Sequence, residues 1–287
     1  MAEQRDQEWD VVIRPHHAWW RLDLKEFWHY RDLLVLMVRR DVVAQYKQTL
    51  LGPLWHVVQP LLTTVTYTIM FGMLARLAPG NMPPLLFYMS GIITWNCFAA
   101  VINRTSRTFV GNAQLMSKVY FPRLVVPVST TASSLVSFAI QFAAFLAIYC
   151  WFFLTTQDRT WGPTPALVFL PVLVLLMSVL SLGTGILVSA LTTKYRDISF
   201  LVGFGIQLLM FASPVIFPMS LVAEHPTMLT VLQLNPMTPV IEGVRAMFFG
   251  GSLDWAGLGY SAAFAAVVMA VALVVFHKVE QYFADIV

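Results

Sequence analysis

The stretch RRDVVAQYKQTLLGPLWHVVQPLLTTVTYTIMFGMLAR, residues 39–76, decides the fold class. Its first nine residues carry four charges, and residues 48–75 then carry none until Arg76. An uncharged apolar run of about 20 residues is long enough to cross the hydrocarbon core of a bilayer as a helix. The stretch therefore predicts a charged approach to a membrane, followed by a membrane-spanning helix.

Further uncharged runs of similar length follow along the chain. The chain is 58% hydrophobic and 11% charged, against roughly 25% charged residues in a soluble domain. Barrel strands would alternate in polarity over about ten residues, so the long continuous runs favour helices. We predict an all-α integral membrane protein with six transmembrane helices. The five further runs are 77–103, 124–157, 160–193, 198–223 and 255–276.

The distribution of basic residues predicts the orientation in the membrane. If the connections alternate sides, one side holds eight Lys and Arg in residues 1–50, four in 103–123, two in 192–197, and Lys278. The other side holds only Arg76, Arg159 and Arg245. Basic residues concentrate on the cytoplasmic side. Both termini are therefore expected in the cytoplasm.

The N-terminal region, residues 1–50, is predicted to be a cytoplasmic tail followed by an amphipathic helix at the membrane interface. From Leu24 onward apolar residues fall within one arc of a helical wheel, although Arg31 interrupts that arc. A soluble helix packed on a partner is the alternative. Residues 51–287 then form the transmembrane domain.

Three connections are predicted to carry structure of their own. The cytoplasmic segments 111–123 and 192–198 are short and exposed, and neither is long enough for a separate domain. On the outer side, residues 219–250 contain two apolar stretches too brief to span the membrane, separated by the turn signal Asn235-Pro236. Short re-entrant or surface helices are expected there.

The sequence lacks the groups that would drive chemistry or transport within the membrane. No paired acids, nucleophile set or metal-ligand spacing lies in the spans, and Cys97 and Cys150 read as packing residues. Secondary carriers normally keep ionisable groups at the membrane midplane, and no GxxxxGK[ST] phosphate loop is present. The chain therefore predicts a transporter subunit, not an enzyme, with no metal or cofactor of its own. The net charge of +3 gives no reason to expect a nucleic acid.

Six stretches resemble, in order, the membrane subunits of ABC-type polysaccharide exporters, which handle O-antigen, capsule and teichoic acid. They are RRDVVAQYKQTLLGPLWHVVQPL, PPLLFYMSGIITWNCFA, KVYFPRLVVP, KYRDI, ASPVIFP and NPMTPVIEGVRAMFFG, between residues 39 and 250. The stretch NPMTPVIEGVR is most similar to the O-antigen branch. The resemblance implies a permease in the bacterial inner membrane that exports a polyprenyl-pyrophosphate-linked glycan.

The resemblance also implies partners. The permease would be a homodimer with an N-terminal gate helix, powered by two cytoplasmic ATPase subunits that bind ATP and Mg²⁺. Coupling contacts with the ATPase would come from the two cytoplasmic segments. These coupling residues are Asn112, Met116, Lys118 and Tyr120 in the first segment, and Tyr195, Arg196 and Asp197 in the second.

A lipid-linked glycan suggests three kinds of site. Cations near the first span could meet the pyrophosphate, aromatic side chains could line a sugar channel, and Glu242 with Arg245 could pair at an outer gate. The ordinary alternatives are the positive-inside bias, helix packing or lipid contact, and an exposed surface pair. The first two sets are Arg39, Arg40 and Lys47 for the cations, and Tyr67, Phe71, Trp95, Phe98 and Phe109 for the channel.

Other functions remain open at this stage. Capsule or teichoic acid export, or export of a drug or small lipid by the same superfamily, fits the same pattern. A secondary carrier or a membrane-embedded enzyme fits less well, because the spans contain no midplane charge and no paired acids.

Overall fold

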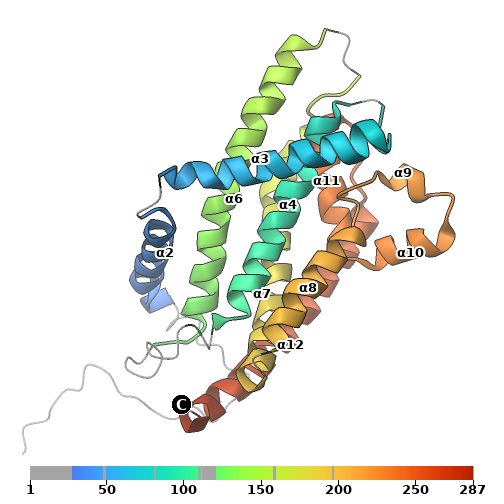
Figure 1. Ribbon diagram of the computed structural model, residues 1–287. Helices are drawn as coiled ribbons and strands as arrows, with labels where there is room; N and C mark the ends of the chain where they lie inside the picture. Colours follow the sequence, from blue (N-terminus) through green and yellow to red (C-terminus); the bar gives the residue numbers. More distant parts are fainter. Residues whose placement is uncertain are drawn as a thin grey trace, which may run out of the picture.

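The computed structural model describes residues 28–47, 50–80, 82–108, 111, 121–157, 160–195 and 197–286. Within these ranges every regular element is a helix and no strand occurs (Figure 1). The all-α prediction is therefore confirmed for the described part of the chain. In chain order the helices are α2 (Arg31–Tyr46), η1 (Gly52–Leu54), α3 (Trp55–Tyr67), η2 (Thr68–Leu74), α4 (Pro84–Thr105), α6 (Val125–Thr155), η3 (Pro165–Phe169), α7 (Leu170–Lys194), α8 (Ile198–Phe211), α9 (Met219–Val222), α10 (Pro226–Leu234), α11 (Thr238–Phe249) and α12 (Trp255–Ile286).

Five of the six uncharged runs contain a helical segment that is long and apolar enough to cross a membrane. Each matches one predicted run, so the chain is a multi-pass membrane protein. The five segments, among the described residues, are Gly52–Leu74, Pro84–Thr105, Val125–Thr155, Pro165–Thr192 and Trp255–Val279.

The run 198–223 departs from the prediction of a sixth spanning helix. Its helix α8 has 14 residues and rises about 21 Å, which is short of the ~30 Å hydrocarbon core. The helix ends before Pro214, because proline lacks an N–H and disfavours helical backbone in the residue before it. The amide of Asn235 then fixes the turn by donating to Oγ of Ser213 (2.7 Å) and the carbonyl of Ala212 (2.9 Å). Six spanning helices are therefore not confirmed.

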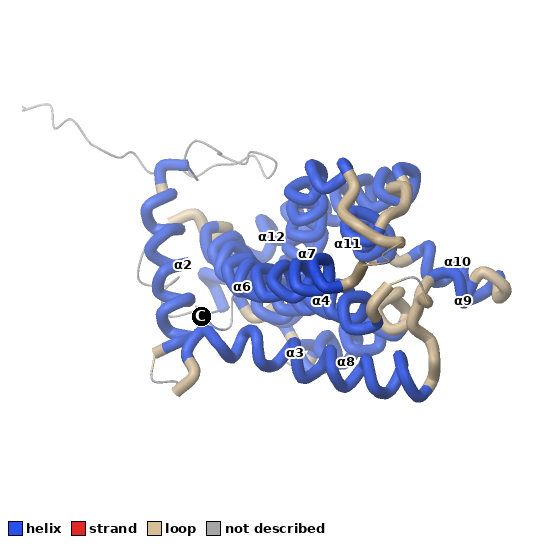
Figure 2. Tube along the Cα trace, turned by 90° about the horizontal axis from the view of Figure 1, so that it is seen from above, coloured by secondary structure: helices blue, strands red, loops and turns tan. Residues whose placement is uncertain are grey.

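Helix α4 lies at the centre of the bundle. In its most apolar 18-residue window, 78% of the residues are buried, because α6, α7, α3 and α11 pack against it. Helix α12 lies along α7, and Figure 2 shows α6, α4 and α7 side by side. The approach of α7 to α4 is close, since a Cβ atom at Gly185 would lie 2.7 Å from Cβ of Thr105.

Helix α3 and its π-helical continuation η2 cross α6 and α4 instead of running beside them (Figures 1 and 2). Thr64 and Thr68 face the bundle and are buried, whereas Leu62, Val65 and Ile69 on the other face are exposed. The short helix α8 also leaves large apolar side chains exposed. In a membrane protein such faces contact lipid or another subunit.

A helix, α2, occupies Arg31–Tyr46 within the region where the amphipathic helix was predicted, and it packs against α6. Met37 is buried in a cluster that includes Phe121 and Phe276, whereas Trp28 and Val35 are exposed. The predicted apolar arc is therefore divided between protein contact and an exposed stripe. Its position at a membrane interface stays a prediction.

The predicted short helices between the last two runs are present as α9, α10 and α11. Helices α9 and α10 project to one side of the molecule in Figure 1, while α11 packs against α4 and α7. Ten of the twelve residues of α11 are buried. Helix α11 is therefore part of the core, although its charged residues made it look like a surface element.

Candidate functional site

The side chain of Arg245 on α11 is buried, with 4% of its surface exposed. Its Nη1 donates to Oε1 of Glu242 (2.8 Å) and to the carbonyl of Pro214. Its Nη2 donates to the carbonyl of Val215 (3.2 Å) and, at longer range, to that of Phe87 (3.4 Å). The guanidinium also lies over the Phe87 ring, 3.7 Å from its centroid. One side chain thus joins α11 to the end of α8 and the start of α4.

The sequence analysis allowed that Glu242 and Arg245 form an ordinary exposed pair, and the structure corrects this. Glu242 and Arg245 do pair within one subunit, three residues apart, but Arg245 is not an exposed surface residue. Burial lowers the pKa of Arg245, while the Glu242 carboxylate raises it. Gly91 on α4 makes room for the guanidinium, because a Cβ atom there would lie 2.9 Å from Nη2.

A cavity of about 740 Å³ lies beside this pair. The Glu242 side chain, 36% exposed, lines it together with Gln233, Phe249 and Tyr260. Asp254 also lines it, but Oδ1 of that residue accepts the backbone N–H of Gly257 (3.0 Å). The cavity therefore offers polar and aromatic surface on the side of the molecule that the topology predicts to be outside.

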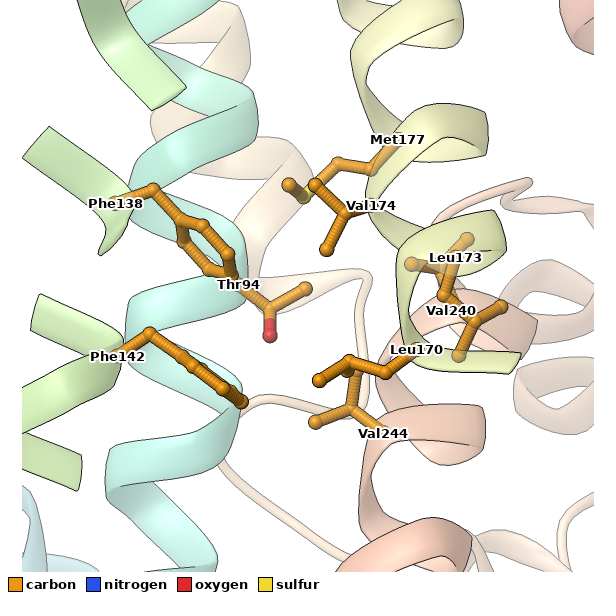
Figure 3. Close-up of a pocket in the computed structure, with 9 residues that line it drawn as sticks. All are labelled: Thr94, Phe138, Phe142, Leu170, Leu173, Val174, Met177, Val240 and Val244. Atoms are coloured by element: carbon orange, nitrogen blue, oxygen red, sulfur yellow. The ribbon is translucent and has the colours of Figure 1, made fainter. Parts of the chain in front are cut away.

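Figure 3 shows Thr94 of α4 and apolar side chains of α6, α7 and α11 around one small space. The space left between them is about 10 Å³, roughly the volume that a single water molecule needs. This zone is packed core and not a ligand site. Its lining residues are Thr94, Phe138, Phe142, Leu170, Leu173, Val174, Met177, Val240 and Val244.

The aromatic channel candidates divide into two groups. Tyr67 and Phe71 are half-buried, and their rings meet edge to face at 5.3 Å between centroids. Trp95 and Phe98 are 3% and 4% exposed and lie within the core cluster, so in this subunit they pack against neighbouring helices. Phe109 lies outside the described residues. The structure thus leaves Tyr67 and Phe71 as the accessible pair.

The basic and coupling candidates lie on the surface where they are described. Arg39, Arg40 and Lys47 are exposed, and Arg40 pairs with Asp41 next to it in the chain (2.8 Å). In the α7–α8 connection, Tyr195 and Asp197 are exposed, so a partner can reach them. The other coupling residues, Asn112, Met116, Lys118, Tyr120 and Arg196, lie outside the described residues.

A second large cavity, about 650 Å³, was not foreseen from the sequence. Residues of α2, α3, α4 and α6 line this open cavity, and each of the four helices contributes polar side chains. Its only trace in the sequence is a set of polar residues within otherwise apolar runs. These residues belong to different helices, so the sequence does not show that they lie close together. The polar residues most relevant here are Gln45, His56, Gln59, Asn96, Arg104 and Gln141.

No metal-binding cluster occurs among the described residues. In this part of the chain, no three His, Cys, Asp or Glu side chains lie close enough together to share an ion. Cys97 is buried and Cys150 is exposed, and both are free thiols.

Comparisons with known proteins identify similar chains. The family described as ABC-2 type transporter matches residues 32–249. An "O-antigen export system permease protein RfbA" of Klebsiella pneumoniae is 27% identical over 261 residues, which cover 89% of this chain and 95% of that protein. A protein of the same name from Myxococcus xanthus is 28% identical over 263 residues, covering 91% and 98%. The similarity extends over nearly the whole length of both relatives.

Proposed function

This chain belongs to the ABC-2 type transporter family, and we propose that it is the permease subunit of an ATP-driven exporter of lipid-linked polysaccharide. The cargo would be an O-antigen linked to polyprenyl pyrophosphate, carried across the bacterial inner membrane. The observation that supports this cargo most directly is the name of the relatives, which match 89% and 91% of the chain. Capsule, teichoic acid and small-lipid cargoes are the alternatives within the same superfamily.

The working unit is a homodimer. The exposed apolar faces of α3 and α8 support this proposal, because Leu62 on α3 and Phe204 on α8 are 62% and 61% exposed. A second subunit would cover these faces and enclose a channel. Helix α8 and the residues that follow it, 198–223, would together make the sixth crossing. Native mass spectrometry of the purified permease should give twice the 32.3 kDa of one chain. A strictly monomeric protein that still exports cargo would contradict the dimer.

Energy comes from a separate ATPase that holds ATP and Mg²⁺. Two copies would dock on the cytoplasmic segments 111–123 and 192–198. The exposure of Tyr195 and Asp197 supports the second contact. Both chain termini face the cytoplasm in this arrangement.

Inside the dimer, Tyr67 and Phe71 form part of the channel wall. Aromatic faces contact the weakly apolar C–H faces of sugars without binding them tightly, which suits a polymer that must keep moving. At the cytoplasmic surface, Arg39, Arg40 and Lys47 attract the pyrophosphate end of the cargo. On the outer side, Glu242 and Arg245 hold α11 beside the exit.

The test is a transport assay in inverted membrane vesicles that contain the permease and its cognate ATPase. Externally added polyprenyl-pyrophosphate-linked O-antigen should become protected from an external glycosidase when ATP is supplied. Omitting the ATPase should abolish protection. Protection of capsular glycan or teichoic acid but not of O-antigen would transfer the assignment to that cargo, and protection without ATP would overturn the mechanism.

A further inference from the structure

The open cavity lined by α2, α3, α4 and α6 contains an arginine at its inner end. Arg104 is the penultimate residue of α4 and is half-buried. From Arg104 the cavity extends up α4 as far as Asn96, a rise of about 12 Å. The half-exposed Trp55 of α3 also lines it, which places apolar surface beside the polar groups. The cavity thus runs from the predicted cytoplasmic end of α4 into the predicted membrane region.

The partners of Arg104 are neutral. The amide of Gln45 is assigned with its oxygen toward Arg104, because in the opposite orientation the oxygen faces only acceptors. So placed, Gln45 accepts from Nη1 (3.0 Å) and Nη2 (2.8 Å) of Arg104 and donates to Nε2 of His56 (3.2 Å). Nη1 of Arg104 also donates weakly to Oγ of Ser134 (3.4 Å). A histidine that accepts at Nε2 is neutral, so it neither cancels nor adds to the arginine charge.

No carboxylate among the described residues lies within ion-pair distance of Arg104 or lines the cavity. Arg245 makes the contrast, because it is buried beside the Glu242 carboxylate. A positive charge that is partly shielded from water and has no counterion attracts an anion more strongly than one in bulk water, because the local dielectric constant is lower. The site therefore has a net positive charge and favours a negatively charged ligand.

The other polar groups fit a ligand with several oxygens. The amides of Gln59, Asn96 and Gln141 supply N–H donors from α3, α4 and α6. Oε1 of Gln141 is buried and accepts no hydrogen bond in the described structure, so it can accept one from a ligand hydroxyl. The planar guanidinium of Arg104 matches two phosphate oxygens at once.

We propose that this cavity binds the phosphate group of a lipid phosphate ester from the inner leaflet, with Arg104 supplying the countercharge. The lipid chain lies along the apolar surface beside Trp55, and the amides hold the remaining phosphate oxygens. This inference rests on the proposed function for its biological ligand, since a polyprenyl-linked glycan carries such a phosphate. The same chemistry occurs in anionic phospholipids, which are the second source.

The experiment measures binding of farnesyl diphosphate to the full chain in phosphatidylcholine nanodiscs by isothermal titration calorimetry. Replacing Arg104→Gln should weaken binding at least tenfold, while Arg104→Lys should retain part of it. The matched control is Arg107→Gln, which removes an equal charge from an exposed position outside the cavity and should change the affinity less than twofold. Equal affinity in the wild type and Arg104→Gln would overturn the proposal.

A second variant covers the case in which Arg104→Gln does not fold. Asn96→Asp keeps the side-chain shape and Arg104, but it places a carboxylate in the cavity. It should also weaken farnesyl diphosphate binding at least tenfold, and unchanged binding would overturn the anion site.

Competing ligands identify the source of the phosphate. Inorganic pyrophosphate and farnesol should each bind at least tenfold more weakly than farnesyl diphosphate, because each lacks one half of the proposed ligand. Phosphatidylglycerol that competes equally would assign the site to phospholipid and overturn its role in cargo binding. If Arg104→Gln lost farnesyl diphosphate binding but still exported glycan, this site alone would be rejected. If the wild type bound farnesyl diphosphate but did not export glycan, the proposed function alone would be rejected.

Discussion

Arg245 and Arg104 show that the groups around a charged residue determine its role. Arg245 has a carboxylate, backbone carbonyls and an aromatic face as partners, so its charge is compensated inside the protein. Among the described residues, Arg104 hydrogen-bonds to the neutral side chains of Gln45 and Ser134. The first arginine therefore holds helices together, and the second is available to a ligand.

Replacing Arg245→Met should destabilise the protein by about 1–3 kcal/mol, because it leaves the carbonyls of the α8 turn without their donor, whereas the Glu242 carboxylate is 36% exposed and can be solvated. The measurement is the thermal unfolding midpoint in detergent. Arg31→Met is the control, since that residue is exposed and should change stability by less than about 0.5 kcal/mol. An Arg245→Met protein as stable as the wild type would show that the buried contacts contribute little.

Trp95 and Phe71 are both aromatic, but they differ in burial, so their replacement should have different effects. Trp95→Ala should cost about 3–5 kcal/mol in stability, because it empties a packed core position that is 3% exposed. Phe71→Ala should cost less but reduce glycan export at least threefold, because Phe71 is half-buried on the proposed channel wall. Unfolding midpoints and the vesicle assay measure the two effects. Unchanged export in Phe71→Ala would assign this side chain to packing.

At the scale of helices, close packing of α7 on α4 organises the bundle. Gly185 permits this approach, because no other residue lacks a Cβ atom and the Cβ would meet Thr105. The exposed helix α8 shows the opposite case, since a Cβ at Gly205 would meet nothing within 4 Å. The two glycines therefore have different structural roles, although the sequence around both is similarly apolar.

Gly185→Ala should destabilise the protein by about 1–3 kcal/mol through overpacking against α4, reduced by a helix-propensity gain of about 1 kcal/mol. Gly205→Ala should be neutral or stabilising by up to about 1 kcal/mol, because only the propensity gain applies there. Unfolding midpoints of both variants in detergent check the pair. If Gly205→Ala proved the more harmful, the second subunit proposed to cover α8 would have to contact this position.

At the scale of the whole molecule, the described chain contains large cavities at two depths and apolar faces on α3 and α8. It contains no nucleotide-binding loop. In the proposed machine, energy would reach this subunit through surfaces that face the ATPase. The exposed α7–α8 connection is one such surface, and it includes Tyr195 and Asp197.

The purified permease should therefore show no ATP hydrolysis above the detergent blank. Adding its cognate ATPase should restore hydrolysis, and Asp197→Lys should reduce the coupled rate by reversing a charge at the proposed contact. The control Arg31→Met leaves that contact unchanged and should retain the rate. ATP turnover by the permease alone would contradict a machine divided between two chains.

The sequence by itself predicted the helical membrane class, five long helices that are present out of the six expected, and short helices between the last two runs, because these follow from local apolar length and turn residues. The family resemblance was also readable from contiguous motifs, and the family match confirms it. Only the tertiary structure decided that Arg245 is buried and that Arg104 shares a cavity with Gln45, His56 and Asn96. Burial and electrostatic pairing depend on which distant helices meet, and periodicity within one helix carries no information about that.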